Sequence, residues 1–572
     1  MPLTTNDGLN KDIAPQENWR FASVFSIAVG LIAFLAVVGP RALQPRNIAW
    51  LGQGDPATHY LGWLFFRNSV WSFPIGLNPK YGLEISNAIL FSDSNPLLAI
   101  IFKPFSHFLP ETFQYFGIWL LACFILQAWF AFKLVGLITK SLSVRTLAAS
   151  FFIFAPPMIW RLHGHLSLVG HFLVLASIYL ALTPSPNRRI ISWAALLVVS
   201  ALTHAYFLVM IGLIWAADML GRLIKRSLPI SRAALEFSIV FGSTLLACWQ
   251  AGYFSVGDGV SSGGFGYYRM NLLSVLDPSG WSYVLRDIPE AGGDYEGFNY
   301  LGLGMIFLGI CSLPSLLNAQ TGLANSVMKR PALLVAILCL TTFALSNKLG
   351  IGSVDLEFKL SDFLMVQVNT FRSSGRMFWP VYYLIYFTFI FLIVRGYSKR
   401  VVIILLGLGL VIQIADTSKV WLDIRAKLMT TPTSTWQTKM TDPFWNEAAA
   451  KYSKVRLLLP KDHASWQAVA SYAGSHTLAT DAVYLARVGK SVQEAAQKKA
   501  MATLQSGEFE SDSLYILEES RLRQVALTLD AQSDLLAQID GFTVVAPGWK
   551  KCATCPKVLG EVKVSDYLPS PL

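Results

Sequence analysis

Asp55 and His59 have the residue types and spacing that suit proton chemistry. They lie four residues apart in the stretch GDPATHYLGWLFFR (54–67), so on a helix both side chains can face the same way. A carboxylate at such a place can take a proton from an attacking hydroxyl group. The alternative is that Asp55, which stands between Gly54 and Pro56, caps a helix beginning at Pro56, and the two roles are compatible.

Arg372 and Arg376 form a second pair with the same spacing, in FRSSGRMFWP (371–380). On a helix both guanidinium groups point the same way, and their forked donors match the oxygens of a lipid phosphate. The alternative is that both side chains snorkel at a membrane surface. Arginine is depleted on the outer side of a membrane, where the charge pattern puts this pair, so we favour phosphate binding.

Other polar residues gather in turns between apolar stretches. Arg161, His163 and His165 crowd WRLHGH (160–165), where we favour an interfacial hydrogen-bonding cluster over a zinc site, because His-x-His without further ligands is a weak signal. Asp93, in FSDSNP, is more typical of a helix cap. The residues that we consider candidates for a substrate site are His59, Glu84, Asp93, His163, His165, His204, Tyr206, Tyr268 and Arg269.

The elements that must position these residues are membrane helices. Only 14% of the 572 residues are charged and 53% are hydrophobic, with a mean hydropathy of +0.47, whereas soluble domains carry about 25% charged residues. Apolar windows of roughly 17–25 residues, the length of a membrane-spanning helix, recur over residues 1–416. The sequence therefore predicts a polytopic α-helical membrane protein. Its net charge of +11 does not indicate nucleic-acid binding, because Lys and Arg gather in short loops rather than on one face.

We predict about eleven transmembrane helices within residues 21–416. Their expected ranges are 21–39, 113–138, 146–161, 165–183, 189–204, 205–221, 234–252, 299–317, 332–346, 376–396 and 400–416. The apolar stretch 97–109 is too short to span and is expected to be re-entrant or to lie in the interface.

The distribution of basic residues predicts the orientation of these helices. Every second connection is short and basic, which places it in the cytoplasm together with a tail over residues 1–20; these connections are 140–145, 185–189, 221–232, 328–330 and 398–400. The long loops 40–112 and 253–298 then lie outside, and all the candidate site residues fall on that outer side. The odd number of helices also puts residues 417–572 outside the cytoplasm.

Residues 417–572 predict a small soluble α/β domain. KVRLLLP (454–460) and FTVVAP (542–547) are typical of buried strands, and AAQKKAMATLQ (495–505) and SRLRQVAL (520–527) of helices. The motif CATC (552–555) fits a redox pair, half of a zinc site or a local disulfide. No second C-x-x-C exists to complete a four-cysteine site, so we favour the structural disulfide.

Several phrases of the chain resemble a known family. GDPATHYLGWLFFR, FSDSNPLL, GFGYYRMNLLS, DYEGFNYLGLG and FRSSGRMFWP look like a bacterial membrane family catalogued as a domain of unknown function, and the likeness covers roughly residues 20–420. A cytoplasmic N-terminus, one span and a long outer loop with an acidic residue also resemble the GT-C superfamily of membrane glycosyltransferases.

The GT-C resemblance implies an activity in the bacterial cytoplasmic (inner) membrane. It implies transfer of a sugar from a polyprenyl-phosphate donor to a glycan or lipid acceptor on the outer side. The acidic position of the first outer loop falls on Asp55, the expected general base, while Arg372, Arg376 and Arg161 would hold the donor phosphate. Many GT-C enzymes have paired acidic residues in this loop, whereas here only Glu84 or Asp93 could complete a pair, so a role for a divalent cation is left open.

Two other classes of function are alternatives. A transporter or flippase of lipid-linked saccharides would be expected to carry ionisable residues deep within several spans and to show internal repeats. A noncatalytic envelope-assembly protein would use its outer domain to bind partners. The polar residues cluster on one side of the membrane and no repeat is visible, so the sequence favours the transferase.

Overall fold

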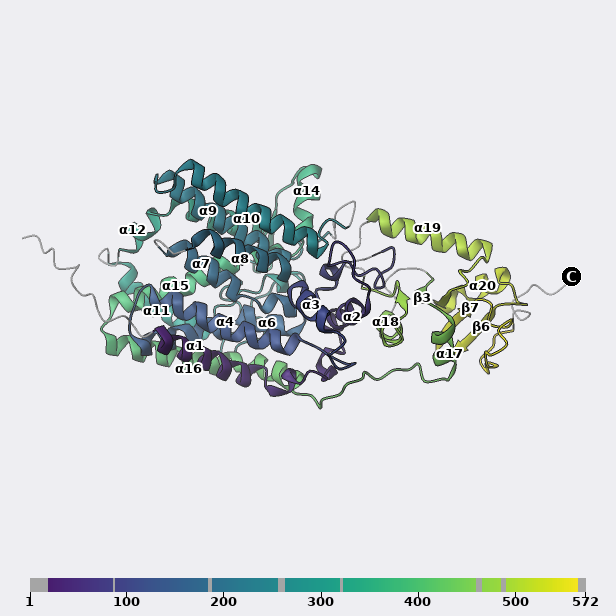
Figure 1. Cartoon of the computed structure of the whole chain (residues 1–572). Coiled ribbons are helices and arrows are strands. Elements are labelled where there is room, and N and C mark those ends of the chain that lie inside the picture. Colours follow the sequence, from purple (N-terminus) through teal and green to yellow (C-terminus); the bar gives the residue numbers. More distant parts are fainter. Residues whose placement is uncertain are drawn as a thin grey trace, which may run out of the picture.

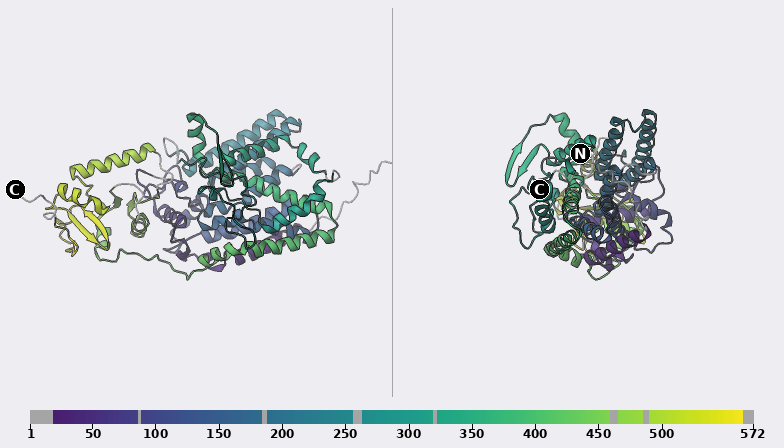
Figure 2. Two further views of the ribbon diagram at one scale, coloured as in Figure 1. Left: turned by 180° about the vertical axis from the view of Figure 1, so that it is seen from behind. Right: turned by 90° about the vertical axis from the view of Figure 1, so that its left-hand side faces the viewer.

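The chain folds into a helical region and a smaller α/β domain. In the computed structural model the described residues are 19–85, 88–183, 188–255, 263–318, 322–458, 465–484 and 490–563. The two parts lie one after the other along a single long axis (Figure 1), and Figure 2 shows the same arrangement from behind. The segment that leaves α16 runs along one side of the molecule to reach α17 (Figure 1).

Each segment predicted to span a membrane is helical. In chain order the helices are α1 (Trp19–Val37), α4 (Phe116–Gly136), α5 (Leu142–Ile153) with α6 (Pro156–Trp160), α7 (Phe172–Leu182), α8 (Arg189–Thr203), α9 (Ala205–Ile224), α10 (Ile230–Ala251), α11 (Leu303–Leu316), α13 (Pro331–Leu345), α15 (Trp379–Gly396) and α16 (Lys399–Leu428). The last helix continues to Leu428, beyond residue 416, where the final span was expected to end.

Fewer helices than predicted are long enough to cross a membrane. Within the described residues, five meet the length and hydropathy of a span, namely α4, α9, α10, α16 and the run Ser374–Gly396 that ends in α15. A sixth is added if α5 and the run Pro156–His163, bent by 42° against each other, form one span. The apolar runs of the other helices have 10–17 residues, the run within α1 being Val24–Val37, and are shorter than the roughly 20 residues needed to cross alone. The structure thus shows five or six helices of spanning length, and the eleven spans stay a prediction.

Small residues bring the helices of the helical region into close contact. A Cβ atom added at Gly30 of α1 would lie 2.7 Å from the Cα of Ile125 in α4. At the contact of α11 with α16, a Cβ atom added at Gly304 would lie 2.0 Å from the carbonyl oxygen of Gly409. Such backbone-to-backbone approaches are typical of helices that associate within a bilayer.

The first long loop forms two short helices, α2 (Asp55–Asn68) and α3 (Pro96–Phe102). α3 and the 3₁₀ turn η4 (Lys103–Phe105) cover most of the apolar stretch 97–109, which is too short to cross a membrane, as predicted. Arg67, near the end of α2, donates hydrogen bonds to the carbonyl oxygens of Pro110 at 2.9 Å and Ser106 at 3.1 Å, which connects α2 to the last part of the loop.

The C-terminal domain contains the predicted α/β structure. Its five-stranded sheet has the order β4-β3-β5-β7-β6, in which β4, β3 and β5 are parallel and β7 is antiparallel to both neighbours. The strands are β3 (Lys454–Leu457), β4 (Ala479–Thr480), β5 (Ser513–Leu517), β6 (Leu535–Ile539) and β7 (Phe542–Ala546), and the helices are α17 (Phe444–Lys451), α18 (Trp466–Ser475), α19 (Lys490–Ser506) and α20 (Leu522–Thr528). Asp540 and Gly541 join β6 to β7 with φ of 52° and 80°, the positive values that a two-residue hairpin turn requires.

The first loop extends the sheet of the C-terminal domain. Residues 80–82 run parallel to β4, where the Gly82 amide donates to the Thr480 carbonyl at 2.8 Å and the Thr480 amide donates to the Lys80 carbonyl at 2.9 Å. α18 packs against α2, and a Cβ atom added at Gly474 would lie 2.7 Å from Leu64 Cδ2. The domain is therefore joined to the first loop through both its sheet and a helix.

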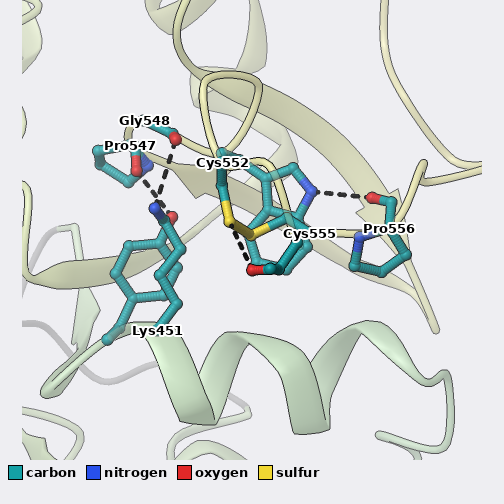
Figure 3. The surroundings of a disulfide bond; sticks show 9 residues. Lys451, Pro547, Gly548, Cys552, Cys555 and Pro556 are labelled. Carbon is teal, nitrogen blue, oxygen red and sulfur yellow. Dashed lines mark hydrogen bonds between the residues drawn. A yellow bond between two sulfur atoms is a disulfide. The ribbon is translucent and has the colours of Figure 1, made fainter.

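Cys552 and Cys555 form a disulfide bond, as favoured from the sequence (Figure 3). The bond lies after β7, where the Trp549 indole donates to the Pro556 carbonyl at 3.1 Å and the Lys451 ammonium donates to the Gly548 carbonyl at 3.3 Å. These contacts hold the segment that carries the disulfide against the domain.

Candidate active site

Asp55 is the first residue of α2, and its carboxylate is accessible. The N-cap is Gly54, whose φ of 65° favours glycine, so Asp55 occupies the first helical turn and does not cap a helix that starts at Pro56. The side chain of Asp55 is 41% exposed and faces His165, with 3.5 Å between Oδ2 and Nε2.

His165 joins Asp55 to a second carboxylate. It lies between the 3₁₀ turns η5 (Arg161–His163) and η6 (Leu166–Val169), and its Nε2 atom is 3.6 Å from Oε1 of Glu296 as well as 3.5 Å from Asp55. Gly164 permits this approach, because a Cβ atom there would lie 3.1 Å from Asp55 Oδ2. The imidazole thus lies between an accessible carboxylate and a buried one.

Glu296 is the centre of a buried cluster of charges. Its Oε2 atom accepts hydrogen bonds from Arg161 Nη1 at 2.8 Å and Arg376 Nε at 3.0 Å, and Oε1 accepts one from Arg376 Nη2 at 2.7 Å. The three side chains are 8%, 2% and 4% exposed. Burial alone would raise the pKa of Glu296, but the guanidinium groups of Arg376 and Arg161 hold that pKa well below its usual range. Two guanidinium groups share one carboxylate, so the cluster keeps a net positive charge.

Aromatic rings fix both buried arginines. The guanidinium carbon of Arg161 lies 5.4 Å from the ring centre of Trp379, and that of Arg376 lies 5.0 Å from the ring centre of Tyr206. The Tyr206 hydroxyl accepts a hydrogen bond from the amide of Ser373 at 2.8 Å. Tyr206 therefore holds the segment between the two arginines of FRSSGRMFWP in place.

Arg372 differs from Arg376 although both come from one motif. Arg372 is partly exposed and lies over the ring of Tyr268, with 5.4 Å from its guanidinium carbon to the ring centre. Among the residues that the structure describes, no carboxylate lies within 4.0 Å of this guanidinium group. Of the two arginines, Arg372 thus has the guanidinium group that a ligand can reach.

Asp93 and His204 form a second acid–imidazole pair beside the cluster. Asp93 Oδ1 lies 3.4 Å from His204 Nε2, and the Asp93 carbonyl accepts a hydrogen bond from Ser167 Oγ at 3.0 Å. Asp93 was expected to cap a helix, but the cap of α3 is Asn95, whose side chain accepts from the amide of Leu98. Asp93 thus lies beside the segment that carries His165, far along the chain from Asp55 but on the same side of the site.

Two of the candidate histidines point away from Asp55. The ring of His59 is buried at 1% exposure and lies 6.2 Å from the ring of Phe116, so it does not share a direction with Asp55. His163 is exposed and stacks at 4.8 Å on Trp160. The 3₁₀ turn at Arg161–His163 sends alternate side chains of WRLHGH to different sides.

Glu84 and Arg269 belong to other ion-pair networks. Glu84 receives hydrogen bonds from Arg456 of the C-terminal domain at 3.0 and 3.1 Å and therefore does not pair with Asp55. Arg269 is 1% exposed and donates to Asp294 at 3.1 Å; it also bonds Asp355 in the hairpin of β1 (Lys348–Ile351) and β2 (Val354–Glu357). Both residues connect segments of the fold.

Two family matches cover most of the chain. The family described as "Domain of unknown function (DUF6311)" matches residues 27–418, and the "DUF6311 C-terminal domain" matches residues 444–547. The chain belongs to the DUF6311 family. No curated protein matches it. In this DUF6311 protein all the groups of the candidate site lie within the first matched region, and the C-terminal domain contacts that region through α2 and residues 80–82.

Glu296 is the residue of the DUF6311 site that sequence reasoning missed. It stands in DYEGFNYLGLG, a phrase used above only for the family resemblance. Loop 253–298 holds six acidic residues, and Glu296 is the one nearest to the predicted span 299–317. Its proximity to an apolar span was the available signal, since a carboxylate there needs a cation as partner.

The described part of the DUF6311 chain contains no group of three or more His, Cys, Asp or Glu side chains arranged to hold a metal ion. Asp55 and Glu296 both approach the same nitrogen of His165, and the Glu296 carboxylate already accepts hydrogen bonds from two arginines. These residues do not fit a divalent cation, so no metal enters the steps proposed below.

Proposed function

We propose that this DUF6311 protein is a membrane glycosyltransferase of the GT-C type. It would transfer a sugar from a polyprenyl-phosphate donor to a glycan or lipid acceptor on the outer side of the bacterial inner membrane. The observation that carries the proposal is the half-exposed Asp55 carboxylate beside His165 and the buried Arg161–Glu296–Arg376 cluster. This arrangement puts a proton acceptor next to fixed positive charge, which is what glycosyl transfer from a phosphate requires.

The proposed reaction is a single displacement with inversion. Asp55 takes the proton of the acceptor hydroxyl while its oxygen attacks the anomeric carbon. The bond from the anomeric carbon to the phosphate oxygen breaks, and the polyprenyl phosphate leaves with the electron pair. His165 orients Asp55 from the side of Glu296, because its Nε2 atom is within 3.6 Å of both carboxylates.

Arg372 is the side chain that we assign to the donor phosphate. Arg161 and Arg376 are buried and held by Glu296, so they act as fixed charge behind the site rather than as direct ligands. Arg372 lies two residues before Ser374, where the Ser374–Gly396 run begins, and it is partly exposed beside Tyr268. A guanidinium group there can contact a phosphate at the membrane surface with two parallel hydrogen bonds.

The membrane placement is supported by two features of the fold. The described chain has five or six helices of spanning length, and the C-terminal domain lies beyond the end that carries α2 and α3 (Figure 1). The loops 221–232 and 328–330, expected in the cytoplasm, come together around one cavity at the other end. One end of the helical region thus carries the C-terminal domain and the other carries basic loops, which fits a cytoplasmic N-terminus and an outer C-terminal domain.

The test is the surface glycan profile, by mass spectrometry, of cells that lack the protein. The cells are re-supplied with wild type, Asp55→Asn, or the control His163→Gln at matched membrane levels. We expect wild type and His163→Gln to restore a missing sugar, and Asp55→Asn to lose at least about 10²-fold in transfer. If Asp55→Asn restored the missing sugar, the assignment of Asp55 as the general base would be overturned. An unchanged profile in the deletion would instead favour transport of lipid-linked saccharide or a noncatalytic role.

A further inference from the structure

Two cavities meet at the end of the helical region that lies away from the C-terminal domain (Figure 1). The first has a volume of about 450 Å³ and apolar walls that include Val327, Ile337, Leu384 and Phe391. The second has a volume of about 270 Å³ and mixed walls, in which charged side chains stand among apolar ones. Leu182, Arg330 and Leu333 line both cavities. The two therefore form one groove with an apolar part and a polar mouth.

The groove arises where two helices separate. α13 packs closely against α9 and against η10 (Ser374–Phe378), the turn that precedes α15, but its contact with α15 itself is slight. The space between α13 and α15 therefore widens towards Pro331, the first residue of α13, where α12 (Leu323–Met328) lines it. In the proposed membrane placement this part of the groove lies at the depth of acyl chains, and its mouth lies at the cytoplasmic headgroups.

The mouth of the groove has more positive than negative charge. Its basic residues are Arg189, Arg222, Lys225, Lys329 and Arg330, and its only acidic lining residue among those described is Asp218. Asp218 is already paired with Arg189 at 2.9 Å and Arg222 at 3.2 Å.

Three cations of the mouth are left for a ligand. Within the described residues, no carboxylate lies within 4.0 Å of Lys225, Lys329 or Arg330. Arg330 donates to the carbonyl oxygens of Leu182 at 3.2 Å and Ser326 at 3.3 Å, which hold it at the junction of the two cavities. Unpaired cations beside an apolar cavity are complementary to a molecule with an anionic head and a hydrocarbon tail.

We propose that this groove binds a phospholipid with an anionic headgroup. An acyl chain would occupy the apolar cavity between α13 and α15, and the phosphate would contact Lys225, Lys329 and Arg330. The positive mouth selects this class of lipid over zwitterionic lipids, since basic pockets between membrane helices bind anionic headgroups. The proposal rests on the membrane placement of the proposed function but not on sugar transfer.

The test is lipid binding to the full chain in detergent micelles, measured by native mass spectrometry. Phosphatidylglycerol and phosphatidylcholine are titrated separately, and we expect wild type to bind phosphatidylglycerol more tightly. Lys329→Gln/Arg330→Gln should weaken phosphatidylglycerol binding by roughly tenfold and leave phosphatidylcholine unchanged. Thr388→Phe, which narrows the apolar part with all charges kept, should weaken both lipids. The matched control is Lys399→Gln/Arg400→Gln, on the same predicted side but outside the groove, and it should bind as wild type does.

Two results would overturn the proposal. One is equal affinity of wild type for the two lipids, and the other is an equal loss in the control variant. If Lys329→Gln/Arg330→Gln does not fold, unchanged binding by Thr388→Phe is decisive against the groove. Asp55→Asn should bind phosphatidylglycerol as wild type does, so a failure of the transferase proposal and a failure of this one are seen in different measurements.

Discussion

The Nε2 atom of His165 lies 3.5 Å from Oδ2 of Asp55. His165 thereby connects the accessible Asp55 carboxylate to the buried cluster of Glu296, Arg161 and Arg376. Asp55 is at the start of α2 in the first loop, and His165 follows α6 more than a hundred residues later. The imidazole of His165 also lies 3.6 Å from Glu296, so one side chain connects the buried cluster with Asp55.

His165→Asn should reduce transfer of sugar in the complemented cells by about 10²-fold, because Asp55 loses the group that orients it. The matched control is His163→Gln, two residues earlier on the same hairpin, whose ring stacks on Trp160 outside the site. The glycan profile at matched membrane levels measures both. Full transfer by His165→Asn would show that Asp55 needs no orienting partner.

Glu296→Gln should destabilise the protein by about 3–5 kcal/mol, because it leaves the buried guanidinium groups of Arg161 and Arg376 without their counter-charge. Thermal unfolding of the full chain in detergent measures the effect. Glu290→Gln on the same loop is the control, since burial and the nearby Asp277 raise the pKa of Glu290 to about 7. Loss of the Glu290 charge should leave the stability of the protein unchanged, or should increase it at pH values above 7. Equal melting temperatures for the two variants would contradict the role assigned to the cluster.

Gly474→Val should loosen the contact between the C-terminal domain and α2. A Cβ atom at Gly474 would lie 2.7 Å from Leu64 and 3.3 Å from Phe65, and overpacking of this kind costs about 1–3 kcal/mol. Hydrogen exchange followed by mass spectrometry should show faster exchange in α2 and β4 but not in β6 and β7. Gly407→Val, in a helix with no atom within 4 Å of the added Cβ, controls for the change in helix propensity. If hydrogen exchange in α2 were unchanged, the contact with α18 would not stabilise α2.

The stability of the C-terminal domain should fall as the pH rises from about 4 to about 7. Burial raises the pKa of Asp481 to about 7, from the ordinary 3.8 of an unfolded chain. The folded state therefore binds this proton more tightly than the unfolded state, and the stability gained below pH 4 is lost as Asp481 ionises. Thermal unfolding of the full chain, followed by tryptophan fluorescence between about pH 5 and about pH 8, measures this slope.

Asp481→Asn keeps an oxygen that can accept the hydrogen bond from the Leu457 amide at 2.6 Å but no longer titrates. The variant should therefore flatten the pH dependence in that window. Glu84 does not titrate in that window, because its pKa is about 2. Burial alone would raise the pKa of Glu84, but the hydrogen bond from Arg456 and further contacts lower it by more. Its contribution is lost only as the pH falls below about 4.5. An equal slope for wild type and Asp481→Asn would assign the pH dependence to other groups.

Local pattern was enough to predict the elements of this protein. Long apolar runs must pair their backbone groups internally if they lie in lipid, and each predicted range does contain helix in the structure. Strands also occur at Lys454–Leu457 and Phe542–Ala546, and helices over 495–505 and 522–527, within the ranges predicted for them; residues 459 and 460 lie outside the described residues. Such predictions depend on neighbours within one or two turns of the chain, and those neighbours are written in the sequence.

The partners of each charged group were decided by the tertiary structure. Arg372 and Arg376 share a motif, yet one faces the surface and the other is bound by Glu296, because a 3₁₀ turn rather than a regular helix follows Arg372. Glu84 pairs with Arg456, which lies hundreds of residues away. The break between α5 and α6, by contrast, is a local feature, because α6 begins at Pro156 and Pro157 follows it.

The sequence by itself determined that the chain is a row of apolar helices followed by an α/β domain, with ionisable residues gathered in the connections between the helices. It also singled out Asp55, His165, Arg161 and Arg376, whose types suit the chemistry. Only the tertiary structure decided that Glu296 joins them and that His59 and Glu84 do not. The reason is physical: a buried charge must find its counter-charge in space, and the distance that matters is measured across packed helices rather than along the chain.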